Sequence, residues 1–122
     1  MSEIPALPLD EARGILPDTA LDELLGKYQS GEVVVLHIEA RKLAVAVRIE
    51  NISAAHKAFK VAIFDPKRQP FAAEEYLKNV TVYPARPELL KLKDRLPFLF
   101  DRLAMRAMEL AGADEDVDGK KD

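Results

Sequence analysis

Two kinds of hydrophobic spacing follow one another in the first half of this 122-residue chain. Residues 18–28, DTALDELLGKY, place apolar side chains at helical intervals after an aspartate that suits a helix start. Residues 31–51, GEVVVLHIEARKLAVAVRIEN, are rich in β-branched residues, and their pattern breaks at residues 40–42. The first stretch predicts a short amphipathic helix, and the second predicts a β-hairpin.

Alternate residues of each predicted strand point to opposite faces of the hairpin. One face gathers apolar residues from both strands, namely Val34, Leu36, Ile38, Leu43, Val45, Val47 and Ile49. A two-stranded hairpin is marginal in water, so this face requires helices over it or further strands beside it. Because the turn lacks the glycine or asparagine typical of tight hairpins, a helix through residues 38–47 is the alternative.

Two further helices are predicted between the hairpin and residue 80. Ser53 suits the cap of a helix that ends at about Phe64, where Asp65-Pro66 stops it. Pro70 suits the first turn of a helix through FAAEEYLKNV, residues 71–80.

Prolines also organise the last third, in VTVYPARPELLKLKDRLP, residues 80–97. The VTVY segment favours an extended chain, and the residue before each proline is pushed away from the helical region. Pro87 and Pro97 can then each occupy the first position of a helix, and Gly112 suits the end of the second one.

These elements predict one α+β domain over residues 18–112, a β-hairpin with about five short helices, the last two joined at Pro97. Residues 1–17 carry three prolines among apolar residues and predict a poorly ordered arm, with a docking segment as the alternative. Residues 113–122 carry five acidic and two basic residues and predict a disordered acidic tail.

Composition excludes several kinds of chemistry. The chain has no cysteine, which removes disulfides, thiolate metal sites and cysteine nucleophiles. Its five glycines are scattered, so they build no phosphate loop, and neither His37 nor His56 belongs to a catalytic or metal-binding motif. We therefore expect a non-enzymatic protein without cofactor or metal. An enzyme whose carboxylates meet only in the fold is the alternative.

The formal net charge of −3 does not favour binding of nucleic acid by the whole chain. The last third is locally basic, however, with Arg86, Lys91, Lys93, Arg95, Arg102 and Arg106. A small nucleic-acid-associated regulatory protein is therefore the alternative function. No run of eighteen apolar residues and no signal-peptide pattern occur, so we expect a cytosolic protein without a membrane anchor.

The last predicted helix, which begins at Pro97, has apolar residues on two sides. One side predicts the core stripe, with Leu96, Leu99, Phe100, Leu103, Ala107, Leu110 and Ala111. The opposite side carries apolar residues among charges, although a helix needs one apolar stripe to dock and methionine suits adaptable contact surfaces. We therefore predict a partner-binding face of Phe98, Arg102, Met105 and Met108. A helix buried on both sides is the alternative.

The order of these elements resembles the tail assembly chaperones of long-tailed bacteriophages and prophages. The resemblance covers roughly residues 18–112, from a leading helix that ends in LLGKYQSG, through the hairpin, to a helix closed by FDP. Its most telling part is Val82-Tyr83-Pro84, followed by a short helix, Pro97 and a last helix that ends in Leu110-Ala111-Gly112.

This resemblance implies a protein of the bacterial host cytoplasm that is absent from the mature virion and has no active site. It also implies that the protein binds and solubilises the apolar, helical tape-measure protein before the tail tube polymerises. The tail-tube protein is a further candidate partner. An unpaired edge of the hairpin makes self-association a further option.

Overall fold

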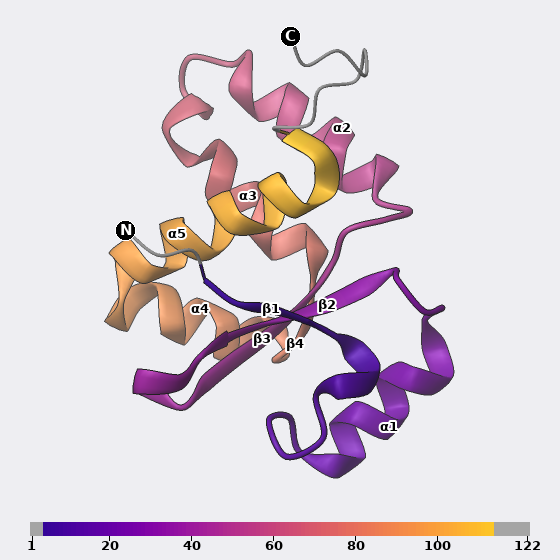
Figure 1. Cartoon of the computed structure of the whole chain (residues 1–122). Helices are drawn as coiled ribbons and strands as arrows, with labels where there is room; N and C mark the ends of the chain where they lie inside the picture. The colour runs from indigo at the N-terminus through magenta and orange to yellow at the C-terminus, as the bar shows by residue number, and fades with distance from the viewer. Residues whose placement is uncertain (1–3, 114–122) are drawn as a thin grey trace, which may run out of the picture.

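A four-stranded antiparallel sheet separates two layers of helix (Figure 1). The structure is a computed structural model, and it describes residues 4–113. The strand order is β1-β2-β3-β4, with bounds Ala6–Pro8, Val33–Ile38, Leu43–Arg48 and Thr81–Tyr83. The helices of this part of the chain are α1 Asp18–Lys27, α2 Ser53–Ile63, α3 Ala72–Val80, α4 Arg86–Arg95 and α5 Pro97–Met108. The predicted α+β class with five short helices is confirmed.

The predicted hairpin is strands β2 and β3, paired in antiparallel register from Val33 opposite Arg48 to Ile38 opposite Leu43. Its turn has no glycine, and Lys42 instead adopts the left-handed conformation with φ of 52°. A helix through residues 38–47 is therefore wrong, since only the short turn Glu39–Arg41 is helical there.

The expectation of a poorly ordered arm is wrong for residues 4–17. Strand β1 pairs with β2, so that Ala6 lies opposite Leu36. The side chains of Leu9 and Leu16 are only 6% and 3% exposed. The prolines Pro5, Pro8 and Pro17 exclude a long helix but permit a short strand and tight turns, which is the structure this segment adopts.

Pairing within the chain also covers both edges of the hairpin. Strand β1 lies along the outer edge of β2, and β4 pairs with β3 through Ala46 opposite Tyr83 and Val47 opposite Thr81. The open hairpin edge on which self-association was argued is therefore absent, and the outermost strands are only three residues long.

Both faces of the hairpin are buried, each in its own hydrophobic cluster. Leu36, Val45 and Val47 pack with residues of α2 to α5, as the sequence pattern predicted. Val33, Val35 and Ala46 pack on the other face with Leu9, Ala12, Leu16, Leu21 and Leu24. Residues 9–28 thus form the second layer of the fold, which is the layer around α1 in Figure 1.

Helix boundaries follow the prolines closely. Helix α4 has Pro87 in its first turn, and α5 begins at Pro97 directly after the non-helical Leu96. A turn at Glu109–Ala113 follows α5, and Gly112 ends it with φ of 105°. The capping roles given to Asp18 and Ser53 are wrong, because Pro17 and Ile52 occupy the cap positions of α1 and α2 without any side-chain hydrogen bond.

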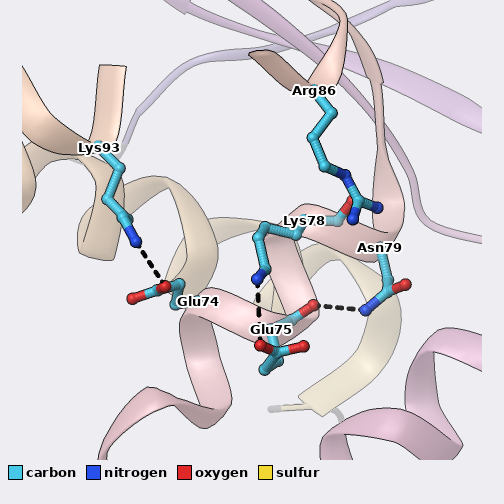
Figure 2. Close-up of polar contacts among 6 residues, drawn as sticks. All are labelled: Glu74, Glu75, Lys78, Asn79, Arg86 and Lys93. Atoms are coloured by element: carbon cyan, nitrogen blue, oxygen red, sulfur yellow. Dashed lines mark hydrogen bonds and ion pairs between the residues drawn. The ribbon is translucent and has the colours of Figure 1, made fainter. Parts of the chain in front are cut away.

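One ion pair and one hydrogen bond hold α4 against α3 (Figure 2). Lys93 Nζ of α4 donates to Glu74 Oε2 of α3 at 2.7 Å, and this hydrogen bond raises the pKa of Lys93 above its ordinary value. The guanidinium of Arg86 donates to the carbonyl oxygen of Lys78 at 3.1 Å, which holds the start of α4 to the end of α3. These contacts set the direction from which the chain enters α5.

A second polar cluster joins the sheet to the loop after α1. Glu32 Oε2 accepts a hydrogen bond from Arg48 at 3.1 Å, and its Oε1 accepts one from the backbone N–H of Gln29 at 3.1 Å. The Arg48 guanidinium lies 5.5 Å from the ring centroid of Tyr28. Glu32 is therefore a structural carboxylate with its partners in place.

If residues 4–17 belong to the core, Leu9→Ala leaves a cavity under β2 and β3. We expect a loss of about 2–4 kcal/mol in the free energy of unfolding, measured by urea denaturation. Leu25→Ala is the matched control, since Leu25 lies on the exposed side of α1 and its loss costs less than about 1 kcal/mol. Equal small effects of the two substitutions would contradict a core role for the N-terminal segment.

Candidate partner-binding site

Helix α5 turns three of the four predicted partner-binding residues to solvent. Phe98 and Met105 are 85% and 59% exposed, and the exposed Arg102 lies between them at helical spacing. The opposite side of α5 is the predicted core stripe, in which Phe100, Leu103 and Ala107 are fully buried. The alternative of a helix buried on both sides is therefore wrong. We call Phe98, Arg102 and Met105 the α5 face.

Met108, the fourth predicted residue, lies elsewhere. It is half-buried and packs against the main hydrophobic cluster. Met108 follows Met105 by three positions, which places it about 60° around the helix from Met105, towards the buried side. Its side chain lines a cleft of about 420 Å³ together with His56, Phe59 and Tyr76. The structure therefore brings together Phe98, Arg102 and Met105 but not Met108.

Beside Phe98 lies a groove of about 470 Å³, between the hairpin turn and the junction of α4 with α5. Its apolar lining comes from Ile38, Ala40, Leu96, Pro97, Phe98 and Leu99. Three arginines also line it, namely Arg41, Arg95 and Arg102. We call this the turn groove, and Phe98 and Arg102 belong both to it and to the α5 face.

The turn groove can hold an apolar segment that also carries carboxylates. Ile38 and Leu99 offer hydrocarbon surface, and arginine binds carboxylates through two parallel N–H donors. Sequence reasoning missed Ile38, Arg41 and Arg95 as members of the site. No local pattern could have found them, because the hairpin turn and the α4–α5 junction meet only in the fold.

Further large apolar side chains are exposed on a different part of the surface. Val61 and Phe64 at the end of α2 and Phe71 before α3 are each more than half exposed. Sequence reasoning did not single out these residues. The nearby Asp65-Pro66 and Pro70 could have indicated their exposure, because prolines end helices and place adjacent residues near loops.

Three of the six basic residues of the last third pair with acidic side chains of the same chain. Lys93 pairs with Glu74, Lys91 Nζ lies 3.6 Å from Glu88 Oε2, and Arg106 Nη1 lies 3.1 Å from Glu109 Oε1. Intramolecular contacts therefore account for much of this local positive charge. These pairings reduce the local positive charge on which the nucleic-acid alternative depends.

The cleft beside Met108 offers no acid–base pair. Burial raises the pKa of Tyr76, so its phenol stays neutral near pH 7. None of the residues within 4–113 that line the cleft carries a carboxylate. Within residues 4–113, no group of three or more histidine, cysteine or acidic residues could hold a metal ion. The same residues contain no helix with the length and apolarity needed to cross a bilayer.

Comparisons with known proteins add no relative. A scan against protein-family models, a search of curated proteins and a search of solved structures each found no match for this chain.

If the α5 face is available to a partner, its aromatic side chain contributes little to folding. We expect Phe98→Ala to change the free energy of unfolding by less than about 0.5 kcal/mol. Phe100→Ala, two positions along the same helix, should cost about 3–5 kcal/mol because its ring is buried. Chemical denaturation measures both values, and a loss above about 2 kcal/mol for Phe98→Ala would contradict an available face.

Proposed function

We propose that this protein is a tail assembly chaperone of a long-tailed bacteriophage or prophage. It binds the tape-measure protein and keeps it soluble until the tail tube polymerises, without catalysing a reaction. The proposal rests on the resemblance of residues 18–112 to that class of chaperone and on one structural observation. That observation is the exposure of Phe98 and Met105 on the helix whose other side builds the core.

The physical argument begins with the partner. A long helical protein with apolar stripes aggregates until those stripes are covered, and an amphipathic helix binds where its apolar side chains find a matching surface. Phe98 and Met105 are seven positions apart on α5, so they present two apolar anchors on the same side of the helix, about two turns apart. Methionine adapts to varied contacts, which suits binding at many places along one partner.

The turn groove extends this surface and adds charge. Arg41, Arg95 and Arg102 line it, so a partner helix with carboxylates beside its apolar stripe fits it best. Apolar anchors then supply most of the affinity, and the arginines select the register of the partner. Such a surface needs no catalytic group.

Co-expression with a tape-measure protein tests the proposal. We expect this chain to raise the soluble fraction of the tape-measure protein encoded beside its gene. Phe98→Asp with Met105→Asp should abolish this effect and weaken binding in pull-down titrations by more than about tenfold, because two central anchors are lost. Both positions are exposed, so the variant should fold, which circular dichroism and thermal unfolding verify.

Phe64→Asp is the matched control, since it also places a charge at an exposed aromatic position, at the end of α2. We expect this variant to retain the solubilising effect. If the tape-measure protein is not solubilised by the unchanged chain, the proposed function is wrong. If Phe98→Asp with Met105→Asp solubilises it as well as the unchanged chain does, the α5 face is the wrong surface.

A further inference from the structure

A groove of about 630 Å³ runs along the outer side of α2. Ala54, Ala58 and Val61 form its apolar part. Lys57 and Arg68 line it as well and give it positive charge. We call it the α2 groove, and it shares no residue with the α5 face or the turn groove.

The surroundings of the α2 groove are also positive. Lys60 and Lys67 lie in the same stretch of chain as Lys57 and Arg68, against the single carboxylate of Asp65. Asp65 Oδ1 already accepts a hydrogen bond from the backbone N–H of Lys67 at 3.0 Å. Among residues 4–113, none of these four cations forms an ion pair.

The chain leaves the described fold next to this groove. Ala113, the last described residue, lines the cleft beside Met108 together with Ser53 and His56. Ser53 also lines the α2 groove, so the two depressions adjoin at the first residue of α2. A carboxylate here is further favoured by the positive end of the α2 dipole.

The residues that follow Ala113 complement the groove in charge and in length. Asp114, Glu115, Asp116 and Asp118 surround a single apolar residue, Val117. Four extended residues reach up to about 13 Å from Ala113 to Val117. The eight steps from Ser53 to Val61 rise about 12 Å along α2, so a segment of this length that enters beside Ser53 matches the groove in length.

We propose that residues 114–118 dock in the α2 groove of the same chain. Val117 contacts the Ala58 and Val61 surface, and the acidic residues on both sides of it pair with Lys57 and Arg68. The contact is governed by charge and is therefore weakened by salt. It rests on no part of the proposed chaperone function and leaves the α5 face open.

Paramagnetic relaxation tests this docking in the full chain. The chain has no cysteine, so Gly119→Cys accepts one nitroxide label and keeps every acidic residue of the tail. In ¹⁵N-labelled protein at about 20 mM salt, we expect strong attenuation of the amide signals of Lys57, Val61 and Arg68 and none at Leu25 of α1. At about 1 M salt these signals should recover at least twofold.

Two variants separate docking from mere tethering near the groove. Lys57→Gln with Arg68→Gln removes the two lining cations and should restore the Val61 signal at low salt at least twofold. Lys91→Gln, which removes an exposed lysine of α4, is the matched control and should leave the attenuation unchanged. Attenuation that is equal in all variants and at both salt concentrations would overturn the proposal.

A mixed sample identifies the chain that supplies the tail. Protein that is enriched in ¹⁵N and carries no nitroxide is mixed with ¹⁴N protein that carries the nitroxide. We expect no attenuation of the Val61 signal, since docking takes place within one chain. Attenuation in this sample would mean that a second copy occupies the groove, and no attenuation in either sample would mean that the groove accepts another partner; both results overturn the proposal.

Discussion

Burial of both faces of the β2–β3 hairpin is the constraint on which the rest of the fold depends. Successive strand residues point to opposite faces, and in this hairpin both sets are apolar, with Val33 and Val35 on one side and Leu36 and Val45 on the other. Each buried side chain of this size contributes roughly 1.5–3 kcal/mol, so neither face can stay in water. The helices α2 to α5 cover one face, and residues 9–28 cover the other.

This constraint also explains why one side of α5 is exposed to solvent. Its buried stripe, with Phe100 and Leu103, completes the cluster over the hairpin. Helices α3 and α4 pack beside it in the same layer (Figure 1), and within residues 4–113 its outer side stays exposed at Phe98 and Met105. Phe98 and Met105 lie on that exposed side, and the proposed chaperone function uses them to bind the partner.

Charges in this protein divide into two groups with different uses. Some are paired within the fold and fix the positions of its elements, as Lys93 with Glu74 fixes α4 and as Arg48 with Glu32 fixes the start of β2. Others line grooves beside apolar surface, as Arg41 and Arg95 do at the hairpin turn and Lys57 does on α2. The fold thus keeps its positive charge available where apolar surface is also available, a combination that suits acidic, partly apolar segments.

The sequence by itself determined the kinds of element and their order, because helices and strands depend on local periodicity and on proline. The hairpin, the helix starts beside Pro87 and at Pro97, and the core stripe of α5 all follow from spacings within a few residues. It also determined that Phe98 and Met105 lie opposite that stripe. The assignment of Met108 to the exposed face was wrong, because the width of a buried stripe depends on which helix packs against it.

Only the tertiary structure decided how distant segments meet. Residues 4–17 form a strand and a core segment because β2 offers them an edge, and no local pattern within the segment indicates that partner. Arg106 Nε donates to the carbonyl oxygen of Ile4 at 2.9 Å, across 102 positions of sequence. The turn groove likewise exists because the hairpin turn lies beside the α4–α5 junction. Contacts of this kind depend on packing of the whole chain, and local spacing carries no record of them.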